Sequence, residues 1–374
     1  MDECELTRRA NVGRRRRLLG ARLVLVALLV ACSGTPDPGP GPVRPERRVV
    51  VAVQEPPDEV QTWPWLDSRL PRRVPASISG LTRLADDPPG RATVVYHPAE
   101  RVPEPVDGWA SETLLLHGID GRWRVLPMDE LGLDDAIWPG HDTYGAGSLS
   151  PDGRWWAGRS RAGVVLLDLG TGRGEIVGAR RWVSEVQWRD DSRSLVVALG
   201  DRPRTELLDL SGRRSTLSFR SGEASAADDG RWWSGRATDD GRWESIEWLD
   251  GTQVSHGAVE LPELRRSQSE QQLVGVEVAG GRGLLTLQRS PYRTLDLVVV
   301  GVSTPELLAH LHLNARNRRA FRDGEWLDPE TVLLQWGPGL VAWRPLEGTF
   351  ARVMDVDLPR DGFASLDVAT DLAR

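Results

Sequence analysis

Short apolar runs separated by turn-forming residues recur along the chain from about residue 46 to the C-terminus. In the clearest example Ser150-Pro151-Asp152-Gly153 precedes one run, residues 154 to 160, and a second run follows at 163 to 169. Pro fixes φ, Asp can bond to its own turn and Gly supplies a positive φ, so the tetrapeptide is typical of a tight turn. The runs are too short for helices and rich in Val and Leu, which predicts nearly buried strands. Residues 306 to 314 alone suggest a short helix, and they fit a strand equally well.

One of these turn-and-run units is repeated almost unchanged. Residues 152 to 159 return at 229 to 236 with one difference, Ala157 against Ser234. The two copies are 77 residues apart, and a third turn at Asp190-Asp191 lies between them, 38 residues after Asp152. A later turn at Asp328 continues this register after a longer gap. A period of 38 or 39 residues is in the range of solenoids, propellers and arrays.

A second register follows the strands. An Asp in or after an apolar run recurs at 168, 209, 250 and 296, and further apolar runs lie at 122 to 126 and 341 to 345. Six units are therefore visible. Four strands in about 40 residues, repeated six times, predict an all-β fold, a β-propeller of four-stranded antiparallel sheets. Six blades are favoured, while strands within residues 46 to 97 would either close the ring or form a seventh blade.

The Pro-Asp-Gly turn followed by an apolar strand and Leu-Leu-Asp-Leu resembles the repeat of the TolB-like, WD40-like bacterial propellers over about residues 92 to 348. The resemblance implies the fold and no particular activity, because propellers both bind and catalyse. Two related patterns are not matched. No Trp-Asp dipeptide recurs at strand ends, and the adjacent Asp152-Gly153 differs from the sialidase Asp-box, which places a residue between Asp and Gly.

The N-terminus has the pattern of an export signal. Four arginines at 14 to 17 precede an unbroken apolar run of nine residues, 23 to 31, which ends at Cys32. A spanning helix needs about 20 apolar residues, so the run predicts a signal peptide. Leu29, Val30, Ala31 and Cys32 resemble the lipobox of bacterial lipoproteins, in which the cysteine is acylated and becomes the first mature residue. The arginine run also fits twin-arginine export, so the route stays open.

Residues 1 to 31 are thus expected to be a lipoprotein signal peptide, 32 to 47 a Pro/Gly-rich tether and 48 to 374 the propeller. The expected location is the outer face of the cell membrane, held by an N-terminal acyl anchor. Cys4 would leave with the signal, and Cys32 is the one other cysteine. The mature chain would then have no internal disulfide and no cysteine nucleophile.

The charge excludes one class of partner. The chain carries −7 overall, and its N-terminal 31 residues hold seven Arg against three acidic residues, a net of +4, so the remainder carries −11. All 47 basic residues are Arg. Because binding to phosphates depends on clustered basic residues, an acidic body of this kind argues against nucleic-acid binding.

Tryptophan is unusually frequent, with 16 residues against 3 Tyr and 4 Phe. The pairs Trp155-Trp156 and Trp232-Trp233 fall on expected strands, where successive side chains face opposite sides, so we expect both to pack in the core. Four others lie in expected loops and are the candidates for stacking on a sugar or small ligand: Trp63, Trp65, Trp109 and Trp138.

No catalytic, metal or cofactor site is predicted. A glycosidase needs two carboxyls about 5 to 10 Å apart, but the adjacent aspartates are explained more simply as turn formers. These pairs are Asp86-Asp87, Asp134-Asp135, Asp190-Asp191, Asp228-Asp229 and Asp239-Asp240. His310 and His312 would share a strand face, yet no third ligand is evident. Neither a Gly-x-Ser-x-Gly elbow nor a phosphate-binding loop is present.

The expected function is therefore non-catalytic binding of one or more envelope proteins. Propeller faces carry variable loops on a rigid scaffold, which suits them for docking. Two alternatives stay open: binding of cell-wall glycan or a small ligand through the loop tryptophans, and a hydrolase or lyase with its site at the propeller axis. The hydrolase or lyase alternative requires carboxylates, histidines or a metal that converge at the axis.

Overall fold

The computed structural model describes residues 51–57, 60–97, 113–131, 147–160, 162–178, 183–199, 204–217, 219, 224–226, 231–237, 242–249, 252–261, 271–289, 294–313, 321–336, 339–356 and 365–373. The expected signal peptide, Cys32 and the tether lie outside these residues, as do Trp109 and Trp138. Apart from short 3-10 turns at Val60–Thr62 (η1) and Met128–Leu131 (η3), the elements described are strands. The described part of the chain contains no helix with the length and apolarity needed to span a membrane.

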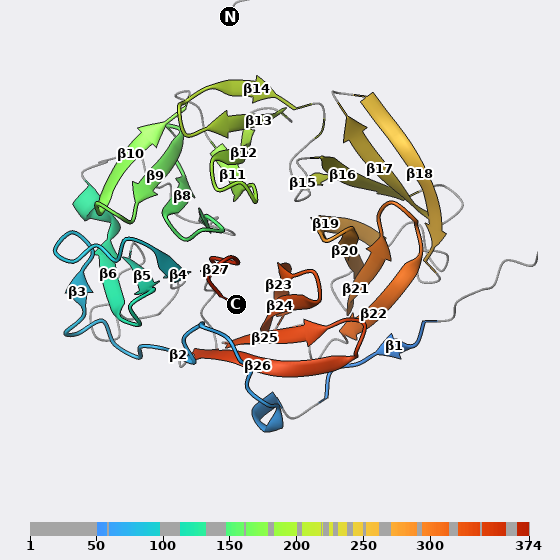
Figure 1. The fold of residues 1–374 in the computed structure, drawn as a ribbon, viewed down its shortest axis with the longest axis horizontal. Coiled ribbons are helices and arrows are strands. Elements are labelled where there is room, and N and C mark those ends of the chain that lie inside the picture. Colours follow the sequence, from blue (N-terminus) through green and yellow to red (C-terminus); the bar gives the residue numbers. More distant parts are fainter. Residues whose placement is uncertain are drawn as a thin grey trace, which may run out of the picture. The chain divides into compact units, whose positions relative to one another are not determined.

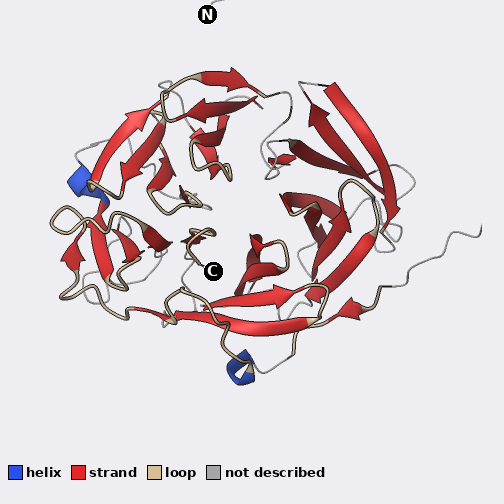
Figure 2. Ribbon diagram, viewed as in Figure 1, coloured by secondary structure: helices blue, strands red, loops and turns tan. Residues whose placement is uncertain are grey.

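The strands form six small sheets around a central opening, which confirms a six-bladed β-propeller (Figures 1 and 2). Blades 2, 3 and 4 are four-stranded antiparallel sheets. Their strands are β7 (Gly147–Leu149), β8 (Trp155–Arg159), β9 (Val164–Asp168) and β10 (Arg173–Val177); β11 (Val183–Trp188), β12 (Ser194–Leu199), β13 (Arg204–Asp209) and β14 (Arg214–Thr216); and β15 (Ala224–Ala226), β16 (Trp232–Ala237), β17 (Arg242–Leu249) and β18 (Thr252–Glu260).

Blades 5, 6 and 1 continue the ring. Blade 5 comprises β19 (Gln271–Ala279), β20 (Arg282–Arg289), β21 (Thr294–Gly301) and β22 (Leu307–Leu313), so the short helical candidate is a strand. Blade 6 comprises β23 (Phe321–Asp328), β24 (Thr331–Trp336), β25 (Gly339–Arg344) and β26 (Thr349–Val356). Blade 1 combines β4 (Ala92–His97), β5 (Thr113–Gly118) and β6 (Trp123–Pro127) with β27 (Ser365–Val368) from the C-terminal end.

Blade 1 closes the ring. Its innermost strand β27 pairs antiparallel with β4, from Ser365 opposite His97 to Val368 opposite Val94. The backbone N–H of Ala369 then donates to the carbonyl of Thr93 at 3.0 Å. The strand Ala92–His97 therefore closes the ring and does not belong to a seventh blade.

Three blades carry a fifth strand, which the four-stranded expectation missed. The segment before β4 runs along the outside of the ring, where β1 (Val53–Gln54), β2 (Arg73–Val74) and β3 (Thr82–Arg83) pair parallel with β22, β26 and β6 (Figure 1). Each added strand is two residues long, too short to produce a recognisable apolar period.

Apolar side chains fill the junctions between neighbouring blades. Five buried clusters lie at five of the junctions, and the cluster between blades 1 and 2, for example, contains Leu114, Leu116, Trp156 and Leu167. At the junction of blades 3 and 4, Phe219 contacts the rings of Trp232 and Trp248. Because both faces of a blade are covered by its neighbours, the strands read as nearly continuous apolar runs.

The repeated turn joins the first and second strands of a blade. In blade 2 the Ser150 hydroxyl donates to Asp152 Oδ1 at 2.7 Å, and that oxygen also accepts the Arg154 N–H. Gly153 has φ +70°, and its carbonyl accepts the N–H of Ala92 in blade 1 at 2.7 Å. The motif therefore joins the innermost strand of its blade to the second strand.

Candidate functional site

A polar side chain occupies the same position on all six innermost strands. Ser148, Gln187 and Ser225 hold it in blades 2, 3 and 4, spaced 39 and 38 residues apart as in the turn register. Glu277, Glu325 and Asp367 hold it in blades 5, 6 and 1. The following residue is apolar in every blade, and Leu149, Trp188, Val278, Trp326 and Val368 are all buried in the wall. These side chains line the central channel of the ring. The channel wall is thus neutral and polar at blades 2, 3 and 4 and acidic at blades 5, 6 and 1.

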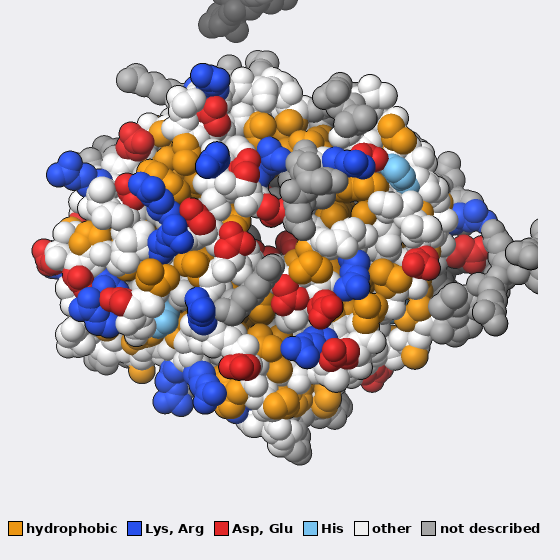
Figure 3. Space-filling view, in the orientation of Figure 1, with side chains coloured by type: hydrophobic (Ala, Val, Ile, Leu, Met, Phe, Trp, Pro, Cys, Tyr) orange, Lys and Arg blue, Asp and Glu red, His pale blue; other side chains and the backbone are white. Residues whose placement is uncertain are grey.

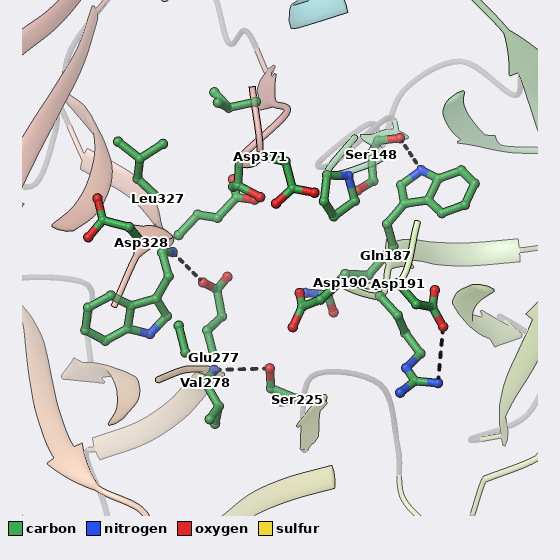
Figure 4. Close-up of a pocket in the computed structure, with 18 of the residues that line it drawn as sticks. Ser148, Gln187, Asp190, Asp191, Ser225, Glu277, Val278, Leu327, Asp328 and Asp371 are labelled. Carbon is green, nitrogen blue, oxygen red and sulfur yellow. Dashed lines mark hydrogen bonds and ion pairs between the residues drawn. The ribbon is translucent and has the colours of Figure 1, made fainter. Parts of the chain in front are cut away.

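One mouth of the channel widens into a cavity of about 650 Å³. Among the described residues, its lining contains six acidic side chains and one basic side chain, Arg189. The acidic residues are Asp190, Asp191, Glu277, Glu325, Asp328 and Asp371. Figure 3 shows acidic side chains gathered around the central opening, and in Figure 4 the carboxylates of Asp190, Glu277 and Asp371 point toward a common space. This mouth has a strongly negative lining.

Two aspartates of the turn register, Asp190 and Asp328, reach this mouth from turns between the first and second strands of blades 3 and 6. They also form turns, as expected. Asp191 Oδ1 accepts the N–H groups of Arg193 and Ser194 at 2.8 and 2.9 Å. Burial raises the pKa of Asp191, but hydrogen bonds from the Ser194 hydroxyl and these N–H groups outweigh it, so the pKa is lowered and the charge is retained. Asp328 Oδ1 similarly accepts the Glu330 N–H at 2.7 Å.

Two inner carboxyl groups, Asp367 and Glu277, lie in different surroundings. Burial, and next the charge of Glu325, hold the pKa of Asp367 well above its ordinary value. Glu277 is held in place differently, because its Oε2 accepts the backbone N–H of Trp326 in blade 6 at 3.2 Å. The neighbouring inner strands of blades 1 and 6 therefore place the carboxyl group of Asp367, with its raised pKa, near the exposed side chain of Glu325.

Arg189 is positioned at the edge of this acidic surface. Its guanidinium lies 3.5 Å from Asp191 Oδ2 and 5.2 Å from the ring centre of Trp232 in the next blade. The neighbouring Trp188 donates its indole N–H to the carbonyl of Ser148 at 2.9 Å, so it joins blade 3 to blade 2. Paired with Asp191 and stacked on Trp232, Arg189 offsets little of the negative charge.

The paired tryptophans divide between core and site. Trp156 and Trp233 are buried, while Trp155 and Trp232 are half-buried, and Trp232 lines the cavity. Trp155 packs against the buried cluster between blades 2 and 3, so the expectation of core packing is wrong only for Trp232, which reaches the cavity. Trp232 is the first residue of β16, the second strand of blade 4, and from there it contributes to the lining of the mouth.

The loop tryptophans within the described residues lie on the outside of blade 6. Trp63 is only 6% exposed and packs against Phe350 with ring centres 5.1 Å apart, so its ring is covered. Trp65 is half-buried, and the guanidinium groups of Arg352 and Arg72 lie 4.2 and 5.2 Å from its ring centre. A cavity of about 210 Å³ adjoins Trp65. A sugar stacked on Trp65 would compete with these arginines.

His310 and His312 both contact the side chain of Asp296. His310 Nε2 and His312 Nδ1 lie 2.9 and 2.8 Å from the same oxygen, Oδ1 of the fully buried Asp296 on β21. Two rings directed at one carboxylate oxygen form a hydrogen-bonded group within blade 5. Among the described residues no cluster of three or more His, Cys, Asp or Glu has an arrangement suited to a metal ion.

Sequence reasoning missed the site because its members are far apart in the chain. The turn aspartates were found but interpreted only as turn formers, and Glu277, Glu325 and Asp367 were not singled out. The sequence does contain a signal for this ring. In each unit a polar residue, followed by an apolar one, lies three or four residues before the Asp or Gly of the turn. Aligning the six units on their turns would have placed these polar residues in one ring.

Comparisons with known proteins bear on the fold alone. No protein-family model matches the chain, and no curated protein matches it. Hydrazine synthase from Kuenenia stuttgartiensis matches 57% of this chain and 68% of its own at 12% identity, with a TM-score of 0.40. An oligogalacturonate lyase in complex with manganese matches 66% of this chain and 71% of its own at 13% identity, with a TM-score of 0.42. A nidogen/laminin complex matches 74% of this chain and 98% of its own at 8% identity, with a TM-score of 0.44. Similarity this low carries no argument about activity.

Proposed function

We propose that the chain is a lipid-anchored, extracytoplasmic propeller that binds a basic segment of an envelope protein at its acidic channel mouth. The observation that supports this most is the lining of the 650 Å³ cavity, in which six acidic side chains face one arginine. A cleft lined by one sign of charge concentrates ligands of the opposite sign and speeds their association.

The shape of the mouth favours an inserted side chain over a flat surface contact. The cavity lies on the axis, and its inner wall carries neutral polar groups on one side and carboxylates on the other. An arginine or lysine side chain entering it would meet Glu277 and Glu325, with Gln187 on the opposite wall.

Binding of a labelled oligolysine peptide tests this proposal. We expect saturable binding that weakens steeply with salt and falls at least tenfold in Glu277→Gln/Glu325→Gln, because two carboxylates leave the wall. Glu347→Gln is the matched control, since Glu347 lies in an exposed turn on the outer side of blade 6 and should bind as wild type. Equal binding by all three proteins would refute the proposed site.

The membrane anchor is tested separately. The lipobox-like Leu29, Val30 and Ala31 support acylation at Cys32, followed by a tether that is rich in Pro and Gly. We expect labelled palmitate to enter the wild-type protein and not Cys32→Ala. Labelling that persists in the variant would contradict acylation at this cysteine.

A second candidate is a hydrolase or lyase with its site at the axis. It is favoured by Asp367, because a carboxyl group whose pKa is raised and that lies near a second carboxyl group, Glu325, is one arrangement that acid catalysis uses. Under this alternative, cleavage of an envelope polysaccharide would be abolished in both Glu325→Gln and Asp367→Asn. Absence of cleavage by the wild-type protein across a panel of such polysaccharides would remove it. The covered rings of Trp63 and Trp65 give no such support to the glycan-binding alternative.

A further inference from the structure

The outer edge of a blade in this protein can accept an additional extended segment. This happens three times, where β1, β2 and β3 pair with the outermost strands of blades 5, 6 and 1. Each segment bonds along the rim of the ring, well away from the axis (Figure 1). The outer strands of blades 2, 3 and 4 have no such partner among the described residues.

These three outer edges differ in how they are protected. Natural proteins keep edge strands from pairing by making them short or charged. The edge strand β14 has only three residues, and β10 carries Arg173 and Glu175. The strand β18 has nine residues, with no proline and no acidic or basic residue other than histidine from Thr252 to Val259. It is therefore the edge with the least protection.

One part of β18 is regular and exposed. Residues Thr252 to Ser255 are exposed and pair with β17 in unbroken register, from Leu249 opposite Thr252 to Ile246 opposite Ser255. Val254 is 40% exposed, which is unusual for a valine in this chain. The register shifts after Ser255, where Gly257 has φ +112°, and this bulge limits the regular edge to four residues.

We propose that this edge of β18 pairs antiparallel with the same edge of a second copy, joining two blade 4 sheets into one. Pairing about a two-fold axis between Gln253 and Val254 sets Thr252 opposite Ser255 and Gln253 opposite Val254 of the second copy. No like charges meet in this register, although the two bodies are acidic. A strand without charges is thus suited to pair with itself.

The dimer formed in this way is weak. Four residues a side bury far less than the roughly 800 Å² per partner of a standard stable interface. Association should therefore depend on concentration in solution. On a membrane, two anchored copies would be held at a high local concentration, which favours the pair without further contacts.

Sedimentation of the full chain in a Cys32→Ala background tests the pairing without an acyl chain. We expect the average mass to rise from one copy toward two over a hundredfold range of concentration. Val254→Lys and Val254→Glu should each remain monomeric, because two like charges then lie beside the axis, and an equal mixture of them should dimerise again. Ser215→Lys, on the exposed edge strand β14, is the matched control and should behave as wild type.

The mixture separates loss of pairing from loss of folding, because neither variant can recover by pairing if it is unfolded. A wild-type chain that stays monomeric throughout the range would overturn the proposal. So would Val254→Lys that dimerises as readily as wild type, or a mixture of the two variants that does not recover.

Discussion

At the scale of single residues, an inner strand places an ionisable group, Asp367, where its charged form is unfavourable. Asp367 retains its proton more strongly than an ordinary aspartate because its half-buried position disfavours the charged form and it lies near Glu325. In the unfolded chain the same group ionises at a pH of about 4. Above that pH the unfolded state has released a proton that the folded state keeps, so this residue lowers stability as the pH rises.

We therefore expect Asp367→Asn to raise the free energy of unfolding at pH 7. The gain should disappear as the pH falls below about 4, where the wild-type carboxyl is protonated in both states. Urea unfolding of wild type and variant at both pH values measures this. Asp371→Asn, an exposed residue at the same mouth, is the control. A loss of stability at pH 7 in Asp367→Asn would show that the ionised form is the one the fold prefers.

Gly153 is a second residue with a specific requirement. Its φ is +70°, and a Cβ there would lie 2.2 Å from the carbonyl oxygen of Ala92 in blade 1. Gly80 has a similar φ of +81° with no atom within 4 Å of such a Cβ. The Gly80→Ala change should thus cost only the conformational strain, about 1 kcal/mol, and Gly153→Ala at least 2 kcal/mol more, because backbone must move. Equal losses in denaturant unfolding would mean that the contact with blade 1 relaxes freely.

At the scale of elements, the sequence predicts the strands well and their partners less well. The turn at Ser150-Pro151-Asp152-Gly153 and the run Val164–Asp168 lie where expected, because turn chemistry and burial on both faces are local properties. The pairing of β27 with β4 joins residues about 270 positions apart, which no local pattern encodes. The two-residue outer strands leave no period to detect.

Closure by β27 makes a prediction of its own. Deleting residues 362 to 374 removes Val368 and Ala369 from two interblade clusters and leaves the inner edge of β4 unpaired. Burial of one valine contributes about 2 kcal/mol, and the strand pairing adds more, so we expect calorimetry to show a melting temperature at least ~5 °C lower. Deleting residues 33 to 45 of the tether, a change of equal length, should leave it unchanged. A truncated chain that melts as wild type would refute closure by this strand.

At the scale of the whole molecule, closing six repeated units into a ring brings equivalent positions of the units together around one axis. Six units of similar sequence bring six polar side chains to one axis, and the acidic ones fall on three consecutive blades. The composition indicated an acidic body but not where the charge gathers. Position on the axis depends on the register of every blade, and this is why the candidate site emerged only from the assembled fold.

The most direct test of the account is photo-crosslinking from the mouth in intact cells. A photoreactive residue at Thr370, which lines the cavity, is compared with one at Glu347 on the outer side of blade 6. We predict that Thr370 yields a discrete adduct with an envelope protein, that Glu347 does not, and that Glu277→Gln/Glu325→Gln abolishes the adduct. No discrete adduct from Thr370, or an adduct that survives loss of both carboxylates, would contradict binding at the acidic mouth.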